Sequence, residues 1–143
     1  MISIMELLEG VGATFAYGLV GLVFMGLGYL LLDWTTPGKL GHLIWTDRNR
    51  NSALVLAARL LGMGAIVTVA IWTNGGLLVE GLVATAIYSL VGLILMTLSF
   101  FCLDLLTPGK LGELLTDHNP HPAAWVSAAS NVAVAAIVCA AIC

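Results

Sequence analysis

The sequence predicts an all-α membrane protein with four transmembrane helices, arranged as two tandem hairpins that are parallel repeats of each other. Three observations support this fold class. Hydrophobic residues make up 60% of the 143 residues and charged residues only 9%, whereas soluble domains carry about 25% charged residues. The chain contains four long apolar runs. The six-residue sequence at positions 36–41 is repeated at positions 107–112. We therefore expect a lipid bilayer around this chain.

The composition also excludes several classes of function. A formal net charge of −3 is too small to indicate a nucleic-acid partner. The three cysteines lie in apolar runs without a CxxC pair, which argues against a disulfide framework. The sequence has no phosphate loop, nucleophile motif or zinc-protease motif. We therefore expect no enzymatic activity, no catalytic residue, no cofactor and no metal.

The first predicted helix covers residues 10–32, the uncharged run between Glu9 and Asp33. Residues 1–9 contain no Lys or Arg, and the run is too long for the apolar region of a signal peptide, so we expect a retained helix. Its length of about 34 Å can cross a hydrocarbon core of about 30 Å. Inside a bilayer each apolar run must satisfy its own backbone groups, which favours helices. The other predicted spans are residues 52–73, 81–103 and 123–143.

The connections between the spans predict the topology. Residues 33–51 and 104–122 are polar and moderately long, whereas only a short turn around Asn74 joins the second and third spans. By the positive-inside rule the two long loops are cytoplasmic, and both termini lie outside a plasma membrane. This rule applies because all five basic residues lie in or beside those loops: Lys39, Arg48, Arg50, Arg59 and Lys110.

An internal duplication relates the two halves of the chain. A shift of 71 positions superimposes Glu9 on Glu80 and Asp33 on Asp104, together with many residues between them. Each unit contains two spans, so both copies enter the membrane in the same direction as parallel repeats. We expect residues 1–73 to form the first two-helix repeat and residues 74–143 the second.

The duplication includes one face of the first and third spans. The repeated residues are spaced four, three and four apart, which places them on one side of a helix. Small residues allow close approach of helix backbones in lipid, so we expect these two spans to pack through this face. The alternative is that the Thr and Tyr hydroxyls line a pore or a substrate path. The repeated residues are Gly10, Thr14, Tyr17 and Gly21 in the first span, and Gly81, Thr85, Tyr88 and Gly92 in the third.

Asp33 and Asp104 each follow an apolar helix at its C-terminal end, where the helix dipole disfavours an anion. Each acid is therefore expected to have a partner: Lys39 or Lys110 in the loops, Arg59 in the second span, or backbone N–H groups. Either the acid fixes the turn into the loop, or it forms a cation or proton site at the cytoplasmic mouth. Thr before Pro favours the start of a short helix over residues 39–45, and this pair occurs as Thr36 and Pro37, and again as Thr107 and Pro108.

Arg59 is the one charged residue inside a predicted span. It lies roughly 10 Å from the start of the span, where its side chain can extend to the headgroup region. The alternatives are an ion pair with an acid such as Asp33, or binding of an anionic headgroup. Ala129 occupies the corresponding position of the second half, so this charge is not part of the duplicated pattern.

The two loop motifs carry a family resemblance. Asp33, Thr36 and Pro37, followed by Asn51-Ser52-Ala53, and the second copy at Asp104, Thr107 and Pro108 resemble the YjfL-like bacterial inner-membrane proteins. This family, also described as domain of unknown function 350 or UPF0719, is built from duplicated two-helix units. The resemblance covers nearly the whole chain, although the second half has His121-Pro122-Ala123 in place of Asn-x-Ala. It implies four spans and a bacterial plasma membrane, and no activity or catalytic residue.

Two functions remain open at this stage. The first is a non-enzymatic membrane module that assembles with itself or serves as a subunit of a larger membrane complex, which the small-residue faces favour. The second is an oligomeric channel or transporter for a small ion or solute, which the repeated Thr and Tyr stripe ending at Asp33 and Asp104 favours.

Overall fold

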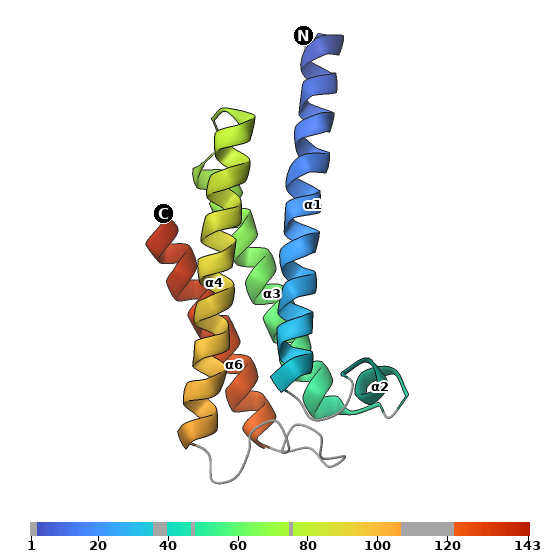
Figure 1. Cartoon of the computed structure of the whole chain (residues 1–143), viewed down its shortest axis with the longest axis vertical. Helices are drawn as coiled ribbons and strands as arrows, with labels where there is room; N and C mark the ends of the chain where they lie inside the picture. The colour runs from blue at the N-terminus through green and yellow to red at the C-terminus, as the bar shows by residue number, and fades with distance from the viewer. Residues whose placement is uncertain (1–2, 36–39, 47, 75, 107–121) are drawn as a thin grey trace.

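The computed structural model describes residues 3–35, 40–46, 48–74, 76–106 and 122–143, and every regular element in these ranges is an α-helix. Four helices are long and apolar enough to cross a membrane. The predicted all-α membrane fold is therefore confirmed. Figure 1 shows the long helices side by side, with the N-terminal part of α1 projecting beyond the others. The helices are α1 (Ile4–Thr35), α2 (Leu40–Trp45), α3 (Arg50–Thr73), α4 (Leu78–Leu106) and α6 (Pro122–Ile142).

α1 and α4 extend past both ends of the uncharged windows that predicted them. α1 begins six residues before residue 10 and continues through Asp33 to Thr35. A charged residue at the end of an apolar run marks where the helix leaves the lipid, and the helical backbone can continue beyond it. A reciprocal cap starts α1: the Ser3 amide donates to Glu6 Oε2 at 3.1 Å, and the Glu6 amide donates to Ser3 Oγ at 3.1 Å. This is the capping box expected at a helix start.

The connection between α1 and α3 contains α2, the short helix expected after the first Thr-Pro pair. Arg48 adopts a positive φ of 53° at the end of this connection. Asn49 then caps α3, since its side chain accepts a hydrogen bond from the Ser52 amide at 3.1 Å. Asn49 is almost fully buried, so the cap belongs to the packed interior.

The core lies along α3, which packs most extensively against α6 and also contacts α4 and α1. One buried cluster in the middle of the bundle contains Met63, Ile66, Leu93 and Met96. Gly62 allows the closest approach, because a β-carbon there would lie 2.9 Å from Met96 Cε and 3.0 Å from Ala135 Cβ. Three helices therefore meet at Gly62. A second cluster, toward the other end, contains Leu32, Val55, Phe100 and Ala124.

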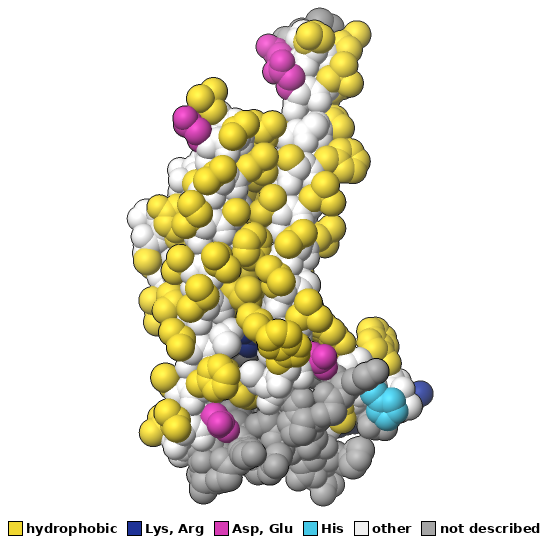
Figure 2. All heavy atoms as spheres, viewed as in Figure 1, with side chains coloured by type: hydrophobic (Ala, Val, Ile, Leu, Met, Phe, Trp, Pro, Cys, Tyr) yellow, Lys and Arg dark blue, Asp and Glu magenta, His cyan; other side chains and the backbone are white. Residues whose placement is uncertain are grey.

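The outer surface is apolar over most of the length of the helices. Figure 2 shows hydrophobic side chains covering this face, with acidic side chains near its two ends. Such a surface is expected in contact with lipid, because lipid tails impose no penalty on exposed Leu, Ile and Phe.

Candidate functional site

The repeated face has a different environment in each half of the chain. On α4, Gly81, Thr85 and Gly92 are buried, as is Ser89 between them. A β-carbon at Gly81 would overlap the Tyr17 hydroxyl of α1, and one at Gly92 would lie 2.8 Å from Ile66 Cδ1 of α3. The structure therefore brings the α4 face against both α1 and α3.

The α1 copy of this face is largely open. Gly10, Thr14 and Gly18 are exposed, and Gly21 is half-buried. No atom lies within 4 Å of a β-carbon built at Gly10 or Gly18, whereas one at Gly21 would contact Val67 Cγ1 at 3.4 Å. Tyr17 is the residue of this face that reaches α4, whereas its counterpart Tyr88 is exposed.

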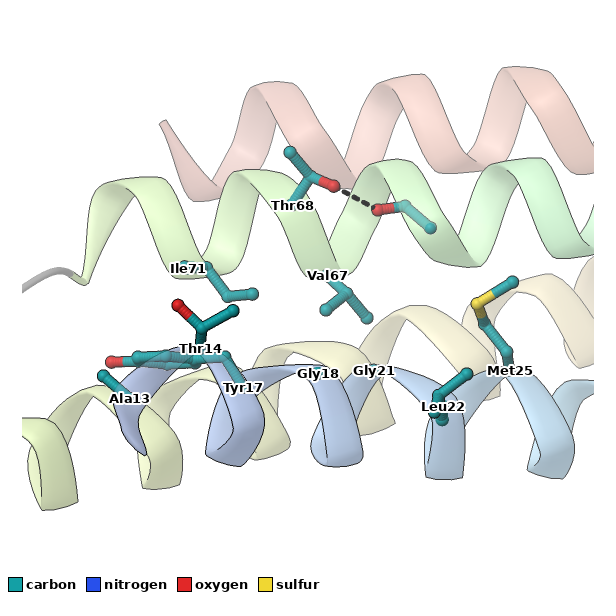
Figure 3. Close-up of a pocket in the computed structure, with 11 residues that line it drawn as sticks. Ala13, Thr14, Tyr17, Gly18, Gly21, Leu22, Met25, Val67, Thr68 and Ile71 are labelled. Atoms are coloured by element: carbon teal, nitrogen blue, oxygen red, sulfur yellow. Dashed lines mark hydrogen bonds between the residues drawn. The ribbon is translucent and has the colours of Figure 1, made fainter. Parts of the chain in front are cut away.

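An open groove of about 630 Å³ runs between α1 and α3 (Figure 3). Its two threonine hydroxyls are already bonded within their own helices: Thr14 donates to the Gly10 carbonyl at 2.8 Å, and Thr68 to the Gly64 carbonyl at 2.7 Å. The groove therefore offers mainly methyl and glycine surfaces, which suit another apolar helix better than a polar solute. The lining residues are Ala13, Thr14, Tyr17, Gly18, Gly21, Leu22, Met25, Gly64, Val67, Thr68 and Ile71.

The structure places Arg59 inside the bundle with 1% of its surface exposed. Nη2 donates to Thr97 Oγ1 of α4 at 2.7 Å, and Nε has no hydrogen-bond partner. Thr97 in turn donates to the Leu93 carbonyl at 2.9 Å. The guanidinium thus connects α3 to α4.

The acids of the two loops lie at the ends of their helices. Asp33 and Asp104 are both half-buried, and each has an interaction within the protein. Six candidate residues of the repeated motif lie outside the described residues: Thr36, Pro37, Lys39, Thr107, Pro108 and Lys110.

Sequence reasoning missed several polar residues of the interior. Thr97 receives the Arg59 hydrogen bond, and Ser99 of α4 is hydrogen-bonded to Ser130 of α6. The repeated row gave no signal for Thr97, because eight positions after Ser89 correspond to about 80° around the helix, and its counterpart in the first half is Gly26. Within the described residues no three His, Cys, Asp or Glu side chains gather to hold a metal ion.

The chain is similar over nearly its whole length to one known family of proteins. The family model described as Domain of Unknown Function (DUF350) matches residues 6–142. The chain belongs to the DUF350 family. A UPF0719 transmembrane protein of Mycobacterium bovis is 37% identical over 142 residues, covering 99% of this chain and 93% of the relative. A UPF0719 transmembrane protein of Mycolicibacterium paratuberculosis is 31% identical over 141 residues, with the same coverage.

This membership confirms the resemblance found in the loop motifs. It also agrees with the four apolar helices, so this DUF350 chain is a multi-pass membrane protein. No solved structure matches it. The family description assigns no activity, and none is indicated for the relatives.

Proposed function

We propose that this protein is a non-enzymatic module of a bacterial plasma membrane that assembles with itself or serves as a subunit of a larger membrane complex. Both termini would lie outside, and the connections α1–α3 and α4–α6 would be cytoplasmic. The observation that carries the proposal is the open groove between α1 and α3, lined by Gly18, Gly21 and Gly64.

Close packing of small residues favours a partner for the groove. In lipid, helices associate through van der Waals contact and not through hydrophobic drive, so surfaces of small residues are the ones that gain most from a partner. The α4 copy of the face is covered by Tyr17 and Ile66 in the same chain. The α1 copy has similar small residues, but no atom of the same chain lies within 4 Å of a β-carbon built at Gly18. We propose that a helix of a second copy packs against it.

The test is the oligomeric state of the full chain in nanodiscs, measured by mass photometry, for the unmodified protein and for Gly18→Leu. The β-carbon of the new side chain meets no atom within 4 Å, and the rest of the leucine occupies the groove that Gly18 lines. We expect oligomers to become monomers. Gly26→Leu is the matched control, because Gly26 is also exposed and uncrowded but does not line the groove.

Two results would contradict the proposal. One is a strictly monomeric unmodified protein with no co-purifying chain after mild extraction. The other is an equal loss of assembly in Gly18→Leu and Gly26→Leu, which would indicate a general effect of added bulk on α1.

A second candidate function is a channel or transporter for a small ion or solute. It is favoured by the buried polar groups on α3 and α4, namely Arg59, Thr85 and Ser89, because polar residues inside membrane bundles often mark a path for ions. Flux into proteoliposomes tests it. Flux that is absent, or that is unchanged by Arg59→Gln, would remove this candidate.

A further inference from the structure

One row of residues on α4 packs that helix into the bundle. Its members are spaced alternately four and three residues apart, which is the spacing of a helix-packing seam. A β-carbon at Gly62 of α3 would lie 2.9 Å from Met96 Cε, so the row meets α3 directly. Four consecutive members of the row are buried: Ser89, Leu93, Met96 and Phe100.

The counterparts of this row on α1, 71 positions earlier, keep the spacing but are mostly exposed. Met25 and Tyr29 are half-buried and pack on the two core clusters. From Leu22 toward the N-terminus every member is exposed as far as Leu8. The chain therefore packs one copy of the row and leaves most of the other open. We name the open part the α1 seam, and it consists of Leu8, Val11, Phe15, Gly18 and Leu22.

A hollow of about 250 Å³ lies on the α1 seam, lined by Thr14, Phe15, Gly18, Leu19 and Leu22. Four of these residues, at positions 15, 18, 19 and 22, have the spacing of the hole that receives a side chain of the facing helix in a coiled coil. Gly18 deepens the hollow, because it has no side chain and no atom lies within 4 Å of a β-carbon built there. Lipid imposes no penalty on exposed apolar side chains, so the evidence for a partner is this shape together with the spacing shared with α4.

Charge and symmetry favour a second α1 as the occupant of the seam. The seam residues are uncharged, and at 3.6 residues per turn Glu6 and Glu9 lie on the opposite side of α1. Copies in one membrane share their orientation, and a two-fold axis along the membrane normal brings the same residue of each copy to the same depth. Two identical seams can therefore meet without opposing like charges. The N-terminal part of α1 projects past the other helices (Figure 1), which leaves it accessible to a second copy.

We infer that α1 of one copy pairs with α1 of a second copy as a parallel coiled coil along the α1 seam. Phe15 of each copy fills the hollow beside Gly18 of the other copy. The pair ends after Leu22, because the row enters the core of its own chain at Met25. This inference rests on the proposed self-assembly and names the helix and the residues that meet. The groove between α1 and α3 borders the seam, since Gly18 and Leu22 line both.

The experiment is a disulfide scan along α1 of the full chain, with the three native cysteines replaced. Single cysteines are oxidised in native membranes with copper phenanthroline, and the fraction of covalent dimer is measured. A disulfide requires β-carbons about 3.5–4.5 Å apart, so we expect dimers for Phe15→Cys and Leu22→Cys. Val23→Cys and Leu30→Cys are the matched controls, because both residues are exposed on α1 away from the seam. We expect loss of the dimer in these two variants.

A second measurement avoids cysteine chemistry. The dissociation constant of the dimer is measured by energy transfer between labelled copies in vesicles of varied protein-to-lipid ratio. Phe15→Ala should raise this constant by about tenfold, because it removes the largest side chain of the seam. Leu30→Ala should leave it unchanged. Phe15 is 70% exposed and Leu30 51% exposed, so both variants should fold, which an unchanged melting temperature of the monomer checks.

Two results would overturn the inference while the assembly proposal stands. One is an oligomeric protein in which Val23→Cys and Leu30→Cys form as much dimer as Phe15→Cys does. The other is a disulfide that forms between copies carrying Phe15→Cys and copies carrying Ala133→Cys, but not between two copies carrying Phe15→Cys. That result would place α1 in the apolar groove between α3 and α6 of the other copy, which Ala133 lines. A strictly monomeric unmodified protein would instead contradict both proposals.

Discussion

The α1 face around Gly18 and the α4 face around Ser89 come from the same repeated sequence but occupy different surroundings. Ser89 is fully buried between helices, whereas Gly18 is exposed beside an open groove. The residues of the two faces are nearly the same, so the difference comes from the position of each helix in the bundle. α4 contacts α1, α3 and α6, whereas α1 packs on α3 and α4 at the side of the bundle.

The second helices of the two halves differ in the opposite way. Arg59 of α3 is buried and bonded to α4, whereas its counterpart Ala129 of α6 is exposed. α3 thus carries the buried charge, whereas α6 contributes Ala135 and Val138 to the apolar core and buries the uncharged Asn131. The interior charge therefore distinguishes the second helix of the first predicted repeat from the second helix of the other.

The largest expected effect is at a pair of methionines related by the repeat. Met96 of α4 is fully buried, so Met96→Ala should lower the free energy of unfolding by about 2 kcal/mol or more through lost packing. Met25 of α1 is only half-buried, and Met25→Ala should cost less than about 1 kcal/mol. Unfolding by steric trapping in bicelles measures both. Equal losses would mean that the two faces are packed alike.

The next effect concerns the glycines that begin the two faces. A β-carbon at Gly81 would overlap the Tyr17 hydroxyl and lie 2.9 Å from the Asn74 carbonyl, so Gly81→Ala should destabilise the fold by about 1–3 kcal/mol. Gly10→Ala meets no atom and should change stability by less than about 0.5 kcal/mol. The same unfolding assay applies. A harmless Gly81→Ala would contradict the contact between α1 and α4.

The smallest effect compares two threonines. Thr85→Val should stabilise the protein by about 1 kcal/mol, because it removes a buried donor that lacks an acceptor. Thr14→Val should change stability by less than about 0.5 kcal/mol, because Thr14 is exposed and bonded to its own helix. Melting curves of the two variants and the unmodified protein provide the measurement. Destabilisation by Thr85→Val would show that this hydroxyl has a hydrogen-bond partner in the membrane.

Much of the fold followed from the sequence. The four helices could be located from the four long apolar runs, and the first and third runs are closed by charged residues on both sides, as by Glu9 and Asp33 for α1. The short helix α2 followed from the Thr-Pro start. The start of α3 and both ends of α1 and α4 were placed too far inward, since apolar windows mark the lipid-facing part of a helix and not its caps at Ser3 or Asn49.

The candidate site was less predictable. The repeated spacing identified one face on each of two helices, but burial of Thr85 and exposure of Thr14 depend on which neighbours pack there. The sequence identified Arg59 as the one charged residue inside a predicted span, but the residues that contact its side chain could not be predicted. Its bond to Thr97 joins residues 38 positions apart, and such a contact is set by tertiary packing and not by any local pattern.

The most direct test of the account is inter-chain cross-linking at the two repeat-related positions, Gly18→Cys and Ser89→Cys, made separately in a chain whose native cysteines are replaced. Each variant is treated in native membranes with a short bifunctional thiol reagent. The account predicts covalent dimers for Gly18→Cys and none for Ser89→Cys, because only the α1 face is open to a second copy. Dimers of Ser89→Cys without dimers of Gly18→Cys would contradict it.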